Sequence, residues 1–532
     1  MANRNLFGST PIQVPNRSGF DLSHENMLTL KCGQLVPVMT DLLIPGDRVS
    51  VGSAFEIQLP PMATDFYGRV RFKMEAFFVP CRLLYGGWQK FMTSPTGNNA
   101  PSATSVGQTL PYCVVPSENA SVLGRGSLAD YLGYKGTVNT RQRINNIMRF
   151  MAYHKIYDDW YRDSRIQKPV FDEAVPVATS ATPLSVAVLP FQGVNGSSLS
   201  YGAATKFADG VDLFSLRQRN WARDYFTNAT PLPQAGTGAS LSFDVAQDSG
   251  SFTIASLRAA NSLQQWLERN NIAGNRYADQ IKAHFGVMPA DAVTQRAIYL
   301  GSSSSVIYNH SVYQTVGVEP SVEVNPNPFS TVGSKYSAPI GSDKSSLVGD
   351  FSVTEFGYLM VIGSIVPDAV YATGINRDFF RLQIGDFAFP LLQGVGDQPI
   401  YKAELANVGV DGDTMDNMAT FGYTQRFAEY KFMEDEVHGG LCDGQSLSAF
   451  ALKRSFGTMP QTALGSSFLE IPVDYLDDVA ASSSSLPSTF GAWADIFFQY
   501  RKTSVLSAYT IPTLGDPHNT HIETVPTGGR RL

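Results

Sequence analysis

The sequence predicts a mainly β protein in which helices and long loops are inserted between strands. Strand-like alternation opens the chain, returns toward its end, and is interrupted by a long stretch typical of helix and loop. Gly (46) and Pro (31) are frequent, and charged residues make up 16% of the chain, against roughly 25% in an average soluble protein. These observations favour a closed or sandwiched β fold whose loops account for much of its size.

The first strands are expected at residues 48–59 and 69–78, with an earlier one at 28–39. In the first two segments apolar and polar residues alternate, which indicates one buried face and one solvated face. Pro60 and Gly68 between them indicate a turn. Later strands are expected at residues 306–314, 351–366, 493–500 and 504–509.

Helices are expected where apolar residues recur at helical spacing. One is predicted over residues 143–162, and a second begins near Ser256, whose side chain suits an N-cap, and stops at Gly274. A third passes through Tyr277, Ile281 and Phe285 and ends at Gly286. Low periodicity and many small residues predict loops at 172–210, 231–253 and 317–348.

We expect one discontinuous domain with five segments. They are an extended N-terminal segment (1–27), the first strands (28–82), insertions rich in helix and loop (83–300), the remaining strands with long loops (301–515) and a C-terminal tail (516–532). A chain with so few charged residues and so many loops often has much of its surface covered by other molecules. Further copies of the same chain could provide this cover.

Charge and cysteine content argue against several classes of protein. The net charge is -7, whereas a protein that neutralises duplex DNA is usually basic, so any nucleic-acid contact must be local. The cysteines at 32, 81, 113 and 442 form no CxxC pair, which argues against zinc and a disulfide scaffold, and reduced thiols suit cytoplasmic assembly. The sequence also predicts no signal peptide and no membrane span.

No catalytic, cofactor-binding or metal-binding residue is predicted. Glu434, Asp435 and Glu436 could serve a glycosidase, as could Asp477 and Asp478, but neighbouring acids more often form a solvated turn. Two interpretations stay open for the acidic group Asp411, Asp413 and Asp416: a calcium loop that is not an EF-hand, and a polar turn. The default interpretation of His518 and His521 is a loose C-terminal tail.

Residues 131–168 combine cations with aromatic rings, and two interpretations stay open. Proteins that bind single-stranded nucleic acid without sequence preference use cations to contact the phosphates and aromatic rings to stack on the bases. The plainer alternative, which we favour, is a structural helix whose aromatic residues fill the core. The candidates for nucleic-acid contact are Arg141, Arg143, Arg149, Tyr153, Trp160, Arg162 and Arg165, and a second group made of Arg217, Arg219, Trp221 and Arg223.

Several blocks of the sequence resemble, in order and spacing, the major capsid protein of gokushovirus-like microviruses, which are single-stranded DNA bacteriophages. The resemblance covers most of residues 16–515. The blocks are NRSGFDLSHENMLTLKCGQLVPVMTDLLIPGD, FKMEAFFVPCRLLYGGWQKF, RINNIMRFMAYHKIYDDWYRD, LRQRNWARDYFTNATPLPQAG, SLRAANSLQQWLERNNIAGNRYADQIKAHFGV with QRAIYLGS, and FGYTQRFAEYKF. The closing segment SVLSAYTIPTLGDPH departs from the family pattern, and residues 231–253 are short where such proteins often carry a surface insertion, so the chain is identified as a divergent member.

The resemblance implies an eight-stranded antiparallel jelly roll and a structural role without enzymatic activity. Sixty copies, with pentamers as assembly units, would form a T=1 shell around a circular single-stranded DNA genome. The implied partners are an internal scaffolding protein, a DNA pilot protein, a small basic DNA-binding protein and a host surface receptor. The implied location is the virion, after assembly in the bacterial cytoplasm. The composition of residues 172–210 and 231–253, rich in Gly, Ser, Ala and Pro, predicts loops that would lie at the particle surface or at subunit contacts.

Two other functions remain as alternatives to the shell. The first is a carbohydrate-binding or glycoside-cleaving β-sandwich, which the lack of a signal peptide and of an acid pair on recognisable strands disfavours. The second is a DNA-binding protein in its own right, which the net charge of -7 disfavours. The same charge means that a shell would need a locally basic inner face, a separate basic protein, or both, to neutralise packaged DNA.

Overall fold

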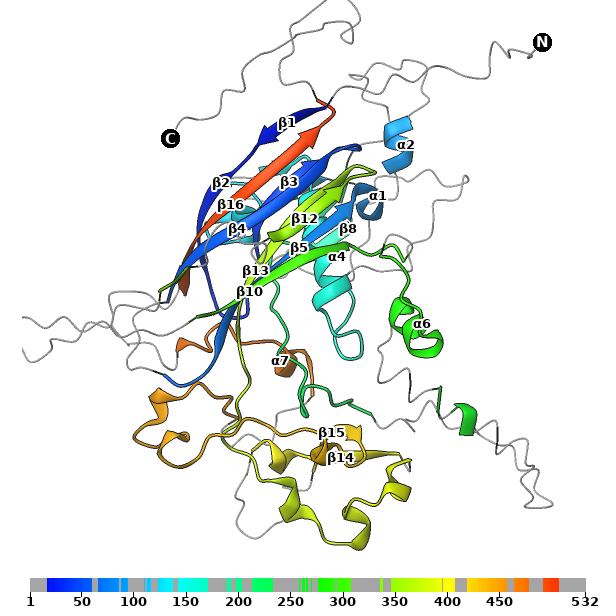
Figure 1. The fold of residues 1–532 in the computed structure, drawn as a ribbon, viewed down its shortest axis with the longest axis vertical. Helices are drawn as coiled ribbons and strands as arrows, with labels where there is room; N and C mark the ends of the chain where they lie inside the picture. The colour runs from blue at the N-terminus through cyan, green and yellow to red at the C-terminus, as the bar shows by residue number, and fades with distance from the viewer. Residues whose placement is uncertain are drawn as a thin grey trace, which may run out of the picture.

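The computed structural model describes a β-sandwich with insertions packed on one side and below it (Figure 1). The described residues are 17–59, 66–85, 88–93, 110, 112–115, 123–136, 142–170, 189–192, 198–202, 213–232, 258, 261–263, 265–266, 269, 276–291, 294–307, 335–337, 346–394, 396–406, 419–456, 464–477 and 491–506.

The first sheet is centred on two long strands, β16 (Ala492–Ser504) and β4 (Arg48–Gln58), which pair along most of their length. The other edge of β16 pairs with β1 (Ser18–Asp21) and β2 (His24–Leu30). The other edge of β4 pairs with β11 (Lys335–Ser337) and β12 (Ser346–Ser352). The second sheet has the order β10 (Ile298–Ile307), β5 (Val70–Pro80), β13 (Gly357–Pro367) and β3 (Val36–Leu43).

The long strands pair in a nested order. The first along the chain, β2, pairs with the last, β16; β3 pairs with β13, β4 with β12, and β5 with β10. All four pairings are antiparallel. Because successive strands alternate between the two sheets, except at the β5–β10 pair, the chain winds around a shared interior.

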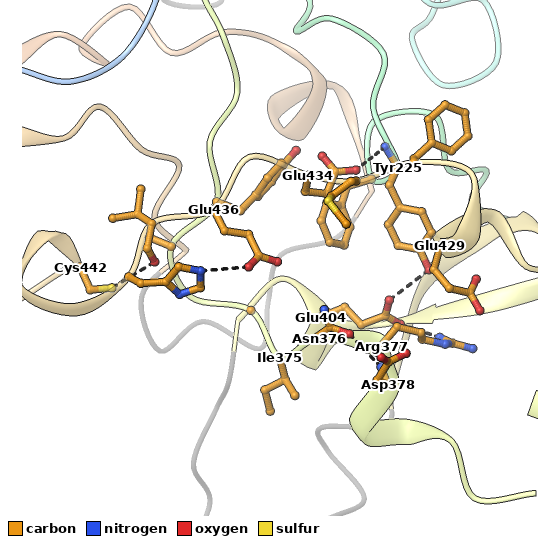
Figure 2. A pocket seen from close by; sticks show the side chains of 18 of the residues that line it. Tyr225, Ile375, Asn376, Arg377, Asp378, Glu404, Glu429, Glu434, Glu436 and Cys442 are labelled. Atoms are coloured by element: carbon orange, nitrogen blue, oxygen red, sulfur yellow. Dashed lines mark hydrogen bonds and ion pairs between the residues drawn. The ribbon is translucent and has the colours of Figure 1, made fainter. Parts of the chain in front are cut away.

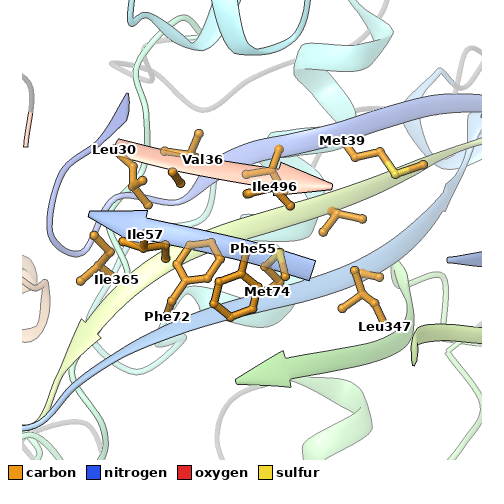
Figure 3. Packing of buried hydrophobic residues seen from close by; sticks show 14 of the residues in the cluster. Leu30, Val36, Met39, Phe55, Ile57, Phe72, Met74, Leu347, Ile365 and Ile496 are labelled. Atoms are coloured by element: carbon orange, nitrogen blue, oxygen red, sulfur yellow. The ribbon is translucent and has the colours of Figure 1, made fainter. Parts of the chain in front are cut away.

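The interior between the sheets is apolar, as period-two alternation predicts. Figure 3 shows Phe55 and Ile57 of β4 facing Phe72 and Met74 of β5, with Ile496 of β16 nearby. The Phe55 and Phe72 rings meet edge to face with centroids 5.0 Å apart. Polar residues alternate with these on β4, where Arg48 and Glu56 are exposed.

The central strands of the second sheet, β5 and β13, are largely buried on both faces, because helices and loops of the insertion between β5 and β10 cover their outer side. Phe77 and Val79 of β5 point to this side and join a second core with α4 (Met148–Ile156) and the π-helix Tyr157–Tyr161. Other elements of the insertion are α1 (Cys81–Leu84), α2 (Trp88–Thr93), α3 (Leu128–Tyr131), β6 (Tyr112–Val115), β7 (Gln142–Ile144), β8 (Leu189–Gln192), β9 (Ser198–Gly202) and α6 (Tyr277–Phe285).

The insertion between β13 and β16 forms a lower unit with a core of its own, drawn in yellow to orange in Figure 1. This core includes Tyr371 and Phe421, and Tyr225 and Phe226 of the insertion between β5 and β10 pack into it. Its regular elements are short: β14 (Asp397–Tyr401), β15 (Thr420–Gln425), α7 (Ser466–Leu469) and the 3-10 turns Arg377–Phe380, Ile384–Asp386, Pro390–Gly394, Lys402–Glu404, Ala428–Tyr430, Gly439–Leu441 and Ser448–Phe450.

The mainly β character and the strands expected at 48–59 and 69–78 are confirmed. The helix ending at Gly286 is also confirmed, and Gly286 takes the left-handed conformation (φ 69°) expected of a C-cap glycine. Of the helix expected at 256–274, residues 258, 261–263, 265–266 and 269 are described, and these are helical.

Two expected single strands are wrong, because each one spans a crossing between the sheets. Residues 28–39 divide into β2 and β3, with Gly33 at φ 70° between them. A Cβ at Gly33 would lie 2.6 Å from the Ile471 Cβ, so the turn needs glycine. Residues 351–366 divide between β12 and β13, which lie in different sheets.

Other boundaries also differ from the predictions. The helix expected from residue 143 begins at Met148, because residues 142–144 pair with β6 and the Asn146 Oδ1 accepts from the Met148 N–H at 2.9 Å. Strand β10 lies at Ile298–Ile307 and contains the first two residues of the strand expected at 306–314, whose other residues lie outside the described chain. Strand β16 is one strand through Ser504. The predicted loops at 172–210 and 317–348 contain β8, β9, β11 and part of β12, and their other residues lie outside the described chain, as do residues 233–253.

Candidate functional site

The residues expected to contact a genome come together behind the second sheet, where α4 and the π-helix meet residues 213–223. Tyr153 lies at the centre of this region and is fully buried. Its hydroxyl donates to the Leu35 carbonyl at 2.7 Å and accepts from the Arg217 N–H at 2.8 Å. Tyr153 therefore ties three chain segments together, and its ring is not available for stacking in the isolated chain.

Two of the candidate arginines are held by carboxylates close to them in sequence. Arg162 pairs with Asp158, one helical turn before it, and also donates to the Gln167 carbonyl at 2.9 Å. Arg165 binds Asp163 through both Nε and Nη2, and its side chain is 5% exposed. Both guanidinium groups are thus used within the chain.

Arg219 pairs with a carboxylate far from it in sequence, Glu75 of β5. Its Nη1 donates to the Glu75 Oε2 at 2.7 Å and to the Ser364 Oγ at 3.1 Å. The Tyr161 hydroxyl donates to the same carboxylate at 2.7 Å. Burial alone would raise the pKa of Glu75, but Arg219 and Lys73 outweigh it and hold this pKa at about 2.

The remaining candidates differ in exposure. Trp160 is half-buried, its Nε1 donates to the Ala297 carbonyl at 2.8 Å, and the Arg296 guanidinium lies 4.2 Å from its ring centroid. Trp221 is 4% exposed and packs against Arg454, 4.7 Å from its ring centroid. Arg149 is half-buried and donates to the Leu132 carbonyl at 3.2 Å.

Arg223 is the most exposed of the candidates whose exposure is described. Its side chain is 57% exposed, and its Nη2 lies 3.9 Å from the Asp163 Oδ2. Arg141 lies outside the described residues, and of Arg143 only the backbone, in β7, is described. Most of the basic and aromatic set is thus a structural network around α4, and contact of any member with a genome stays a prediction.

His154 belongs to the same network. The sequence did not predict its role, because a single histidine within a helix forms no recognisable motif. It is fully buried; its Nε2 lies 2.8 Å from the Leu213 carbonyl and its Nδ1 lies 3.4 Å from the Arg217 Nε. This geometry fits a neutral ring that donates through Nε2 and accepts through Nδ1. Burial, together with the charge of Arg217, lowers the pKa of His154 to about 3.

A pocket of about 430 Å³ opens in the lower unit (Figure 2). Buried aromatic residues and a set of charged residues line it. Glu404, whose side chain is 3% exposed, binds Arg377 at 2.6 Å and accepts from the Tyr225 hydroxyl at 3.1 Å. These contacts join residues 225, 377 and 404 into one wall of the pocket.

Glu434 is the one predicted acid that faces this pocket with a strongly shifted pKa. Burial, with a further contribution from Asp224, raises the pKa of Glu434 to about 7. Its carboxylate accepts from the Tyr225 N–H at 2.9 Å. Asp435 has a structural contact as well, since its carbonyl accepts from the Tyr371 N–H at 2.8 Å.

Glycoside cleavage needs a second carboxyl group free to act across the cleft from the first. Every other carboxylate that lines the described pocket already has a protein partner. Glu436 pairs with His438 at 3.2 Å, and Glu404, Glu429 and Asp378 bind Arg377, Gln398 and Arg381 respectively. The arrangement is therefore one of ion pairs and capped acids.

The described residues contain no group of three histidine, cysteine or acidic side chains that could hold a metal ion. Asp411, Asp413 and Asp416, like His518 and His521, lie outside those residues, as does Asp478. No helix in the described part of the chain is long and apolar enough to cross a membrane.

Comparisons with known proteins match nearly the whole chain. A sequence model of the family described as Capsid protein (F protein) matches residues 10–247 and 240–514. Capsid protein VP1 of Chlamydia phage 1 is 27% identical over 612 residues, covering 96% of this chain and 98% of that protein. The proteins of the same name from Bdellovibrio phage phiMH2K (25% identical, 96% and 98% covered) and Spiroplasma virus 4 (24%, 94% and 95%) are similar too.

Proposed function

This chain belongs to the capsid protein (F protein) family, and we propose that sixty copies of it form a T=1 icosahedral shell around a circular single-stranded DNA phage genome. The resemblance to microvirus capsid proteins is confirmed by these relatives, and the chain is a structural component of the virion, not an enzyme. The observation that carries the proposal is similarity over almost the full length of capsid proteins, at 24–27% identity.

The sandwich supports the further proposal that the shell domain is an eight-stranded jelly roll. The nested pairing of β2 with β16, β3 with β13, β4 with β12 and β5 with β10 is what a rolled-up antiparallel hairpin produces. A double-sheet jelly roll is an architecture typical of viral capsid domains. In this proposal β1 and β11 extend the first sheet at its edges.

Genome contact is proposed to be local and limited, because the chain carries a net charge of -7. Among the candidates with described side chains, Arg223 and Arg149 are the better choices, since Arg162, Arg165 and Arg219 are already paired with carboxylates. We propose that a small basic protein supplies most of the counter-charge. An internal scaffolding protein, a DNA pilot protein and a host surface receptor complete the proposed partners, with assembly in the bacterial cytoplasm.

The test is the structure of the particles that this chain forms during infection. Particles purified from infected cells should be closed in electron micrographs, and a three-dimensional reconstruction should contain sixty copies of the chain around circular single-stranded DNA. The expected result also includes nuclease protection of that DNA. A stable, monodisperse monomer at high concentration, or a shell of larger triangulation number, would contradict the proposal.

A further inference from the structure

One part of the lower unit exposes an unusual number of large apolar side chains. We call this surface the apolar arm, and it consists of the segment 377–391 and the adjacent residues 430–433. Its exposed members are Phe379 (79%), Leu382 (74%), Ile384 (79%), Phe387 (51%), Phe389 (46%), Leu391 (91%), Tyr430 (52%), Phe432 (56%) and Met433 (98%).

Arg381 joins the two segments of the apolar arm, and Arg426, just before the second segment, binds the first. The Arg381 guanidinium lies 4.6 Å from the Tyr430 ring centroid and 5.6 Å from that of Phe387. The Arg426 Nη2 donates to the Gly385 carbonyl at 2.8 Å. The apolar arm is therefore one continuous surface and not a scatter of isolated residues.

Hydrogen bonds give the apolar arm a defined backbone. The Asn376 Oδ1 caps the first turn by accepting from the Asp378 N–H at 3.0 Å. The Asp386 carboxylate accepts from the N–H groups of Leu382 and Gln383 at 2.9 and 2.8 Å. Polar groups thus stabilise the arm from within, while its apolar side chains point to solvent in the isolated chain.

Both arginines in the first segment of the apolar arm are paired within the same chain. Arg377 binds Glu404, and Arg381 lies between Asp378 (2.8 Å) and Glu429 (3.8 Å). Lys431 adds one exposed cation to the arm, but a single lysine among nine exposed apolar side chains is too few for a nucleic-acid backbone. The chemistry that complements it is another apolar protein surface.

The area of the apolar arm is that of a stable protein–protein interface. Nine large side chains, each about half to almost fully exposed, present on the order of 1,000 Å² of mainly apolar surface. A standard interface buries about 800 Å² on each partner, and monomeric proteins rarely expose an apolar patch above a few hundred Å². Left uncovered, this surface would favour aggregation.

We propose that the apolar arm is a subunit interface covered by a second copy of this chain. The inference rests on the proposed shell function, because a shell built from one chain supplies copies of that chain at fixed positions beside every subunit. A closed shell also needs contacts in which one surface meets a different surface on the next subunit, so the arm need not pair with itself.

The test compares two matched double variants of the most exposed leucines. Leu382→Ser with Leu391→Ser removes apolar contact, whereas Leu382→Met with Leu391→Met keeps it at nearly the same volume. The serine variant is expected to fold, by near-ultraviolet circular dichroism, but to yield more than about tenfold fewer particles in sedimentation. The methionine variant is expected to assemble like the wild-type chain.

The outcomes separate this inference from the proposed shell. Wild-type particles together with normal assembly of the serine variant would overturn the interface and leave the shell intact. Serine-variant particles that assemble but fail to infect would also overturn it, because the occupant would then not be a second copy. If the wild-type chain forms only small oligomers, the shell fails, and loss of those oligomers in the serine variant would still support the interface.

Discussion

Behind the second sheet, charged side chains lie inside the protein, whereas in the apolar arm large hydrophobic side chains lie on its surface. Arg219 and Glu75 are 15% and 10% exposed, while Ile384 and Leu391 are 79% and 91% exposed. Each region departs from the usual distribution of residue types. The difference shows that the network pairs its buried carboxylates and arginines within one chain, while the apolar arm requires a neighbour to cover it.

The largest expected effect comes from opening the buried network. Arg219→Ala should lower the free energy of unfolding by about 3–5 kcal/mol, because it leaves the Glu75 carboxylate buried without its main partner. Arg223→Ala, in the same segment but with a side chain that is 57% exposed, should change it by less than about 0.5 kcal/mol. Urea unfolding of the dissociated chain measures both, and equal effects would contradict the comparison.

An intermediate effect should follow from acidification, through His154. Its pKa is about 3 in the folded chain against 6.5 unperturbed, so below pH 6.5 the unfolded chain takes up a proton that the folded chain does not. Stability should therefore fall as pH decreases from 6.5, by about 1.4 kcal/mol for each pH unit and about 2 kcal/mol at pH 5.

Glu434 acts in the opposite direction, so the measurement needs a background without it. Its pKa is raised from 4.5 to about 7, so its contribution to stability is present at low pH and is lost as pH rises through that range. In the Glu434→Gln variant, the free energy of unfolding measured in urea should therefore fall between pH 6.5 and 5 through His154, without the opposing contribution of Glu434. Adding His154→Gln should flatten this dependence, and an unchanged slope would count against the assignment.

The smallest effect on stability is expected in the apolar arm, although its effect on assembly should be large. Phe379→Ser and Ile384→Ser should each change the free energy of unfolding of the dissociated chain by less than about 0.5 kcal/mol, since both side chains are 79% exposed. Thermal unfolding at low protein concentration measures this. A loss of several kcal/mol would mean that the arm packs within its own chain, and the contrast between the two regions would disappear.

Local pattern predicted the sandwich strands better than the site. Alternation identified β4 and β5, because in each strand every second residue is polar over much of its length. Gly286 marked the end of α6. Alternation could not show that residues 28–39 and 351–366 cross between sheets, because β3 and β13 are buried over most of their length and show no clear period of two. The aromatic and basic residues at 131–168 left a structural helix and genome contact both open, and composition could not name the partner of any arginine.

The sequence by itself determined the mainly β character, the family and the absence of an obvious catalytic motif, because these depend on residue order and on periodicity over a few neighbours. Only the tertiary structure decided that Arg219 meets Glu75, 144 residues away, and that Arg48 meets Asp350, 302 residues away. It also decided that Leu391 lies outside while Leu359 is fully buried. The physical reason is that burial and pairing depend on which distant segments pack beside a residue, and no local pattern specifies that.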